Sequence, residues 1–175
     1  MRHGQIALKL ATEHDMPLLA VRIAANLGLA LMWREQYDAA WDHYALTVPL
    51  AQHAGAARTE AVALTNQALA GALGQATSGP QRREAIRCGL RSVELFRTLS
   101  DDYGRAVTRN NLGVVYTSVL QLREAFACHT AAVDGLRAFK DQRELVARDD
   151  AGYRLQAGTF MRLWDSGGLP EFLSF

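Results

Sequence analysis

The chain has 175 residues, a length typical of one domain, and its 49% hydrophobic and 21% charged residues suit a protein that buries a core. The 19 Lys and Arg nearly balance the 18 Asp and Glu, so the formal charge of +1 excludes a general attraction to nucleic acid or to an acidic membrane. No apolar run approaches the roughly 18 residues that span a bilayer, and Lys9 and Glu13 interrupt any signal-peptide core. The two cysteines, Cys88 and Cys128, lie outside any metal-binding spacing, which predicts a soluble, reduced, cytoplasmic protein.

Hydrophobic residues recur at helical spacing from the amino-terminal end onward. Ala24, Leu27 and Leu31 share one helix face, and the same spacing resumes in the following segment. Between these two helices, Gly28 and Ala40 are small enough to let the backbones approach closely. In chain order, the pattern predicts eight helices and a short terminal segment, at residues 4–13, 17–32, 37–54, 58–74, 81–99, 103–118, 121–139, 143–163 and 170–174.

The sequence also repeats itself. Asn26-Leu27-Gly28 recurs as Asn66-Gln67-Ala68, 40 residues later, and as Asn111-Leu112-Gly113, 45 residues after that. A weaker copy, Asp150-Ala151-Gly152, follows after 39 residues, and Ser78-Gly79-Pro80 explains the longer interval as an extended loop. Each unit is therefore predicted to be a pair of helices.

These residues resemble the tetratricopeptide repeat family, whose pattern includes Leu-Gly, Tyr and Ala positions across two antiparallel helices. Ala40 and Tyr44 of the first unit match that pattern, as do Tyr116, Ala125 and Ala132 of the third. The period near 40 is longer than the usual 34 and is similar to repeats of large bacterial transcriptional activators and peptide-sensing regulators.

The resemblance implies an all-α fold, a right-handed superhelical solenoid of about four helix-turn-helix repeats in one domain, 1–175. Residues 1–13 would be a partial repeat or a cap, because a solenoid needs polar ends. Three repeats would follow, then a degenerate repeat with a terminal cap, at residues 17–54, 58–99, 103–139 and 143–175. The chain would be either a fragment of a larger regulator or a small stand-alone relative.

The resemblance also implies that the first helix of each pair lines a concave groove. The residues expected there are Arg22, Asn26, Leu29, Trp33, Thr65, Asn66, Leu69, Asn110, Asn111, Val114 and Tyr153. A row of Asn amides can donate to and accept from the backbone of an extended peptide of any sequence, while the apolar residues contact its side chains. Two alternatives are that the Asn residues only bridge helices within the solenoid, and that the groove holds a small molecule.

The sequence gives little support for catalysis, metal binding or phosphate binding. The pairs Asp101-Asp102 and Asp149-Asp150 lack the third Asp of a metal-binding DDxxD pattern, and no phosphate loop or hydrolase motif occurs. We therefore expect no enzyme activity, cofactor, metal or nucleic-acid binding, and we expect Asp101 and Asp102 to begin a helix. The apolar end of the chain, with Phe172 and Phe175, is either a lid or a self-association surface.

The expected function is a non-enzymatic scaffold or regulatory module that binds a protein or peptide segment. The alternative is a self-assembly module, such as a homodimer. A helical enzyme or a small-molecule binder is less favoured.

Overall fold

The computed structural model describes residues 2–74 and 79–145. These ranges hold seven α-helices and no strand, which confirms the all-α class. The helices are α1 (Arg2–Glu13), α2 (Pro17–Trp33), α3 (Tyr37–His53), α4 (Ala57–Leu73), α5 (Gly79–Thr98), α6 (Asp102–Ser118) and α7 (Leu122–Leu145). Clustering of contacts divides the chain after Phe139, and the unit before this point is the one described below. The first unit contains α1 to α6 and most of α7.

The first six predicted helices begin and end within two residues of the observed ones. The break predicted at residues 140–142 is wrong, because α7 continues without interruption to Leu145. Those three residues are Lys, Asp and Gln, and none of them breaks a helix as Gly or Pro does. The rest of the helix predicted at 143–163, and the segment at 170–174, lie outside the described residues.

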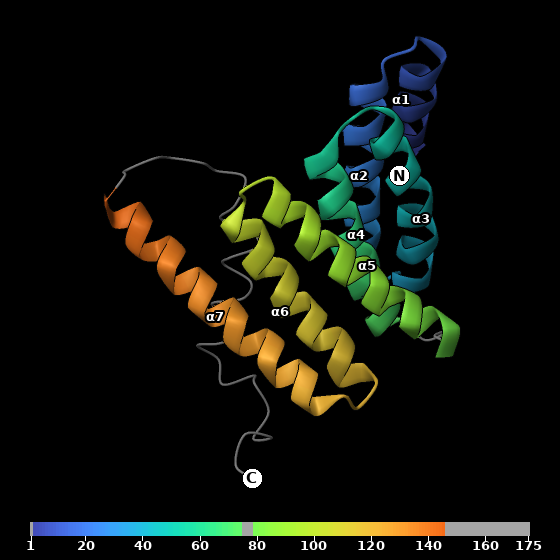
Figure 1. The fold of residues 1–175 in the computed structure, drawn as a ribbon. Helices are drawn as coiled ribbons and strands as arrows, with labels where there is room; N and C mark the ends of the chain where they lie inside the picture. Colours follow the sequence, from blue (N-terminus) through green and yellow to red (C-terminus); the bar gives the residue numbers. More distant parts are fainter. Residues whose placement is uncertain (1, 75–78, 146–175) are drawn as a thin grey trace. The chain divides into compact units, whose positions relative to one another are not determined.

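Consecutive helices pack against one another in hairpins. From α1 to α6 each helix contacts the next one, and α4 also contacts α2 and α6 (Figure 1). Helix α7 packs on α6, where the rings of Tyr103 and Phe139 lie 4.8 Å apart. The first helices of the hairpins, α2, α4 and α6, are therefore neighbours in space.

Small residues set the distance within the hairpins, as the sequence predicts for Gly28 and Ala40. A Cβ atom on Gly28 would lie 2.6 Å from the ring of Tyr44, and Ala40 is fully buried. The equivalent contact between α6 and α7 places the ring of His129 against Gly113, where a Cβ atom would lie 2.6 Å away. In both hairpins, a ring from the second helix packs directly on the backbone of the first.

Five connections between the described helices share one conformation. In each, the helix ends in a residue with positive φ, between 51° and 63°, at Asp15, Glu35, Gly55, Ser100 and Leu120. The N–H of the next residue then bonds back to a carbonyl five positions earlier, as in Gln36 to Leu31 (3.0 Å) and Asp101 to Phe96 (2.9 Å). This is the Schellman arrangement that commonly ends helices.

The residue that follows the positive-φ residue also begins the next helix. The carbonyl of Gln36 accepts from the N–H of Ala40 at 2.9 Å, and the carbonyl of Asp101 accepts from Arg105 at 3.0 Å. Asp101 adds a side-chain cap, since its Oδ1 accepts from the N–H of Gly104 at 2.8 Å. The helix start expected at Asp101 and Asp102 is thus confirmed.

Replacement of Gly55 by Ala tests the importance of this turn. The substitution places a Cβ on a residue with φ of 63°, and it should lower the free energy of unfolding by about 1 kcal/mol. Urea denaturation measures the change. Gly79→Ala is the control, because a Cβ there meets nothing closer than 3.7 Å at the start of a helix, and it should change stability by less than about 0.5 kcal/mol. Equal losses in both variants would contradict a special role for the turn.

Candidate functional site

The candidate site lies on one side of α2, α4 and α6, at positions that the repeat makes equivalent. Positions separated by four, seven and eleven residues lie on one side of a helix, and the repeat aligns these positions across the three helices. We call this surface the first-helix face. Its rows are Arg22, Val62 and Val107; Asn26, Asn66 and Asn111; Leu29, Leu69 and Val114; and Trp33, Leu73 and Ser118.

The exposure of this face differs from helix to helix. On α2, Asn26 is exposed and the Trp33 side chain is 67% exposed, while Leu29 is half-buried. On α4, Asn66 is buried and Leu69 is half-buried. On α6, Asn110, Asn111 and Val114 are half-buried. Helix α4 is the most covered because α2, α3, α5 and α6 all pack against it.

Asn66 connects two helices of the fold. Its Nδ2 atom donates a hydrogen bond to the hydroxyl oxygen of Tyr44, at 3.2 Å, between α4 and α3. Burial raises the pKa of Tyr44 well above its usual 10, although the bond from Asn66 acts in the opposite direction. At this position the structure has the helix-bridging arrangement that the sequence left open as an alternative to peptide contact.

Thr65 lies in a buried cluster of hydroxyl groups rather than at the surface. Its Oγ1 atom is 2.7 Å from the hydroxyl of Ser92 and 2.8 Å from that of Thr108. Ser92 donates to the carbonyl of Ala61 at 2.8 Å, and Thr108 donates to that of Gly104 at the same distance. The cluster joins α4, α5 and α6. The sequence analysis missed it, although a polar residue within the apolar stripe of each of these helices is a signal that could have found it.

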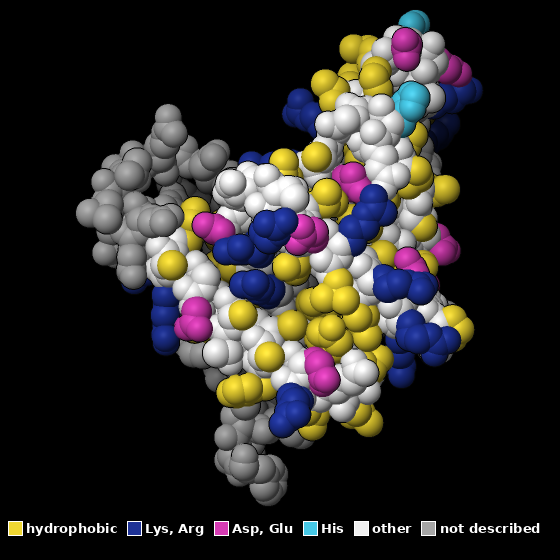
Figure 2. All heavy atoms as spheres, in the orientation of Figure 1, with side chains coloured by type: hydrophobic (Ala, Val, Ile, Leu, Met, Phe, Trp, Pro, Cys, Tyr) yellow, Lys and Arg dark blue, Asp and Glu magenta, His cyan; other side chains and the backbone are white. Residues whose placement is uncertain are grey.

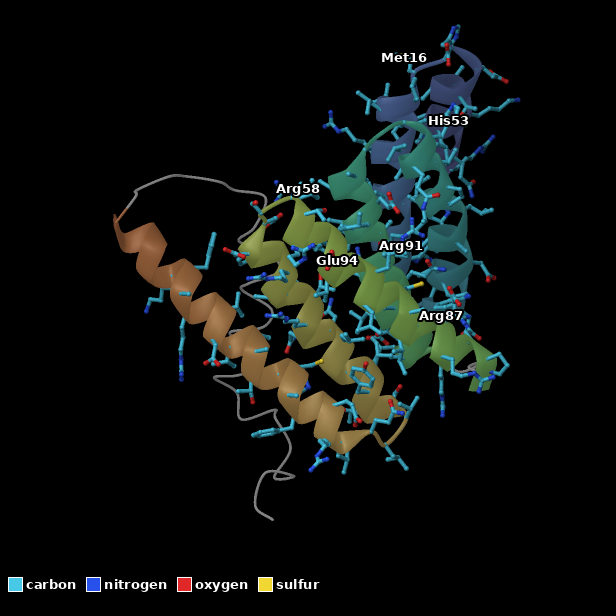
Figure 3. All side chains as sticks on the ribbon, viewed as in Figure 1. Met16, His53, Arg58, Arg87, Arg91 and Glu94 are labelled. Atoms are coloured by element: carbon cyan, nitrogen blue, oxygen red, sulfur yellow. The ribbon has the colours of Figure 1, made fainter. Side chains whose placement is uncertain are left out.

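Ion pairs and a hydrogen bond also join helices within and between the hairpins. Glu60 is only 7% exposed and accepts from Gln52 of α3 at 2.9 Å and from Arg91 of α5 at 2.5 Å. Arg58 lies at the start of α4 (Figure 3), and it pairs with Asp101 at 3.0 Å. These charged residues pair with other residues of the fold. Among the rows of the first-helix face, Arg22 is the single charged residue.

The second helix of the last hairpin positions Asn110. Its Oδ1 atom accepts from Nδ1 of His129, at 3.1 Å, across α6 and α7. Burial lowers the pKa of His129 below its usual 6.5. The neutral ring, packed on Gly113, therefore holds Asn110 beside the first-helix face.

Metal-binding clusters and reactive thiols were sought among the described residues. Within it, no three His, Cys, Asp or Glu residues gather to hold a metal ion. Burial raises the pKa of Cys88 to about 12, with Glu84 adding to the effect, and burial also raises the pKa of Cys128. Neither free thiol is therefore poised as a thiolate at neutral pH.

Three predicted site residues, Tyr153, Phe172 and Phe175, lie outside the described residues. Among the helices of residues 2–74 and 79–145, none is long and apolar enough to cross a membrane.

Comparison with known proteins adds no relative. No protein-family model matches the chain, and no curated protein matches it. The resemblance to tetratricopeptide repeats therefore stays a prediction from the residues.

Asn66 and Asn26 occupy the same column of the repeat, but their replacement should have different effects. Asn66→Ala leaves the buried hydroxyl of Tyr44 without its donor, so it should lower the free energy of unfolding by about 1–3 kcal/mol. Asn26→Ala removes an exposed side chain and should change it by less than about 0.5 kcal/mol. Urea denaturation of both variants measures the difference, and equal stabilities would exclude a bridging role for Asn66.

His129 should make stability depend on pH. Because its pKa is lowered in the folded state, the unfolded chain binds the proton more readily. The contribution of neutral His129 is fully present above pH 6.5 and is lost as pH falls through the folded pKa. The stability advantage of the natural protein over His129→Gln should therefore shrink as pH falls from about 7 to about 5. Thermal unfolding of both proteins across this range measures the effect, and a constant difference would contradict it.

Proposed function

We propose that this chain is a non-enzymatic binding module whose first-helix face contacts an extended segment of another protein. The observation that carries the proposal is the alignment of equivalent positions on three neighbouring helices, α2, α4 and α6. Rows of like residues that run across successive helices offer repeated contacts to a ligand that lies across them.

The rows differ in chemistry in a way that suits a peptide. The row of Leu29, Leu69 and Val114 is apolar throughout, and it lies beside the row of Asn residues. Apolar side chains of a bound segment would contact the first row, and its backbone groups would bond to Asn26 and Asn111. Asn66 would contribute less, since its amide nitrogen is already bonded to Tyr44.

Trp33 is the residue from which we expect the largest single contribution. Its side chain is 67% exposed at the end of α2, next to Arg34 and Glu35 of the turn. Large aromatic side chains dominate the energetics of many interfaces because they bury much apolar area with few rotatable bonds.

The family and the setting are part of the proposal. A right-handed solenoid of tetratricopeptide type, within or related to a bacterial regulator, accounts for the Asn-Leu-Gly repeats, the hairpins and the close approach at Gly28 and Gly113. The alternative is a self-assembly module. Light scattering across concentration separates the two, because a monomer near 19.2 kDa supports peptide binding and a stable dimer supports self-assembly.

Binding of selected peptides tests the first-helix face. Peptides are selected from a random display library on the full chain, and their affinities are then measured for Trp33→Ala. We expect Trp33→Ala to weaken binding about tenfold or more. Leu46→Ala is the matched control, because Leu46 is 68% exposed but lies on α3, and it should bind as the natural protein does. Equal affinities for all three proteins would overturn the proposal.

A further inference from the structure

A second, partly apolar surface lies at the end of α6, next to Ser118 of the first-helix face. Where α5 begins and α6 ends, a cavity of about 350 Å³ is lined by Ile86 of α5 and by Val119 and Leu120 of the α6–α7 turn. Leu90, one helical turn after Ile86, is 50% exposed. We call Ile86, Leu90, Val119 and Leu120 the turn patch. Figure 2 shows hydrophobic side chains gathered where the first half of α5 passes the end of α6, with Lys or Arg side chains beside them.

Leu120 is the central residue of this patch. Its side chain is 83% exposed, and its φ is 59°. A branched side chain is strained in this left-handed conformation. Three of the other four turns of this kind hold Asp, Glu and Ser at the equivalent position, and the fourth holds Gly55. The α6–α7 turn therefore carries a large apolar group into solvent at a position where a polar or small residue suits the backbone better.

The charge around the cavity indicates what would cover it. Arg82 and Arg83 line it together with the apolar residues, and among the described residues no acidic side chain does. The acidic residue that follows them on α5, Glu84, is bonded to Arg87, whose Nε atom donates to it at 2.7 Å. The cavity thus combines an apolar floor with two arginines that no acid of the described lining neutralises.

We propose that the turn patch docks a segment of a partner protein that carries a bulky apolar side chain flanked by acidic residues. The apolar side chain enters the cavity between Ile86 and Leu120, and the acidic residues pair with Arg82 and Arg83. The four residues of the turn patch do not belong to the first-helix face, although Ser118 of that face also lines the cavity.

Synthetic peptides of matched length test the chemistry of the partner. The probe is acetyl-Glu-Glu-Leu-Phe-Glu-Glu-amide, added to the ¹⁵N-labelled full chain and followed by amide chemical shifts. We expect saturable shifts at Ile86, Leu120 and Gln121. Two control peptides, one with Lys in place of each Glu and one with Ser in place of Leu and Phe, should bind at least about tenfold more weakly.

The variant Leu120→Gly removes the central side chain without loss of the turn. Glycine adopts positive φ freely, so this variant keeps the fold while the peptide should bind at least about tenfold more weakly. The double variant Arg82→Gln, Arg83→Gln should lose most of the salt dependence of binding. Leu46→Ala, on α3, should bind the probe unchanged.

Four outcomes would overturn the proposal. The first is equal binding of all three peptides, and the second is full affinity in Leu120→Gly. The third is saturation of the same shifts by inorganic phosphate, which would indicate a site for anions alone. The fourth is a shift of Leu120 on dilution without any peptide, which would identify a second copy of the chain as the occupant.

Discussion

The arrangement of the helices depends on a backbone constraint, the use of one residue both to end a helix and to begin the next. Gln36 donates its N–H to the carbonyl of Leu31 and accepts with its own carbonyl from Ala40. Both ends of the connection are thus hydrogen-bonded, which leaves the chain little freedom between the helices. Because the same turn recurs at Gly55 and at Leu120, successive helices meet in a similar way, and equivalent residues return to one side.

Helix α4 is the centre of the common core, because α2, α3, α5 and α6 all pack against it. Its neighbours cover it so fully that four polar residues on it are buried, and each has a partner on another helix, including Gln67, which accepts from the Cys88 thiol at 3.6 Å. Thr65 reaches Ser92 and Thr108, Asn66 reaches Tyr44, and Glu60 reaches Arg91. A hairpin that shifted along its neighbour would leave several of these groups unbonded in the interior, which is costly. The polar contacts therefore specify the register that the apolar residues alone would leave less certain.

The sequence predicted the helices well because their signals are local. Apolar spacing located the first six helices, and the small size of Gly28 and Ala40 predicted the close packing within a hairpin. The turns were harder to predict, since Asp15, Glu35, Ser100 and Leu120 adopt a conformation usually associated with glycine. Helix α7 continues through residues 140–142, where the sequence predicts a break although Lys, Asp and Gln do not interrupt a helix.

The candidate site was predicted in outline only. The repeat relates Asn26, Asn66 and Asn111, which lie on the neighbouring helices α2, α4 and α6, but it carries no information on how deeply each helix is covered. Burial of Asn66 depends on the four helices around α4, and that is a property of the whole array. The turn patch gave no sequence signal, because Ile86 and Leu120 belong to different hairpins and meet only in the folded chain.

The shared junction residue also has a consequence for how such a chain can change in length. The hairpin of α2 and α3 lies between the turns at Asp15 and Gly55, and both turns have the same backbone bonds. Deletion or duplication of the segment between them would leave a turn of the same conformation at the new junction. The angle between the helices on either side of that turn would therefore stay the same. Side-chain contacts between hairpins, such as the hydrogen bond from Gln52 of α3 to Glu60 of α4, restrict which hairpins can follow each other. Within that limit, the array can grow or shrink by whole hairpins, and the length of any ligand it accommodates would change in the same steps.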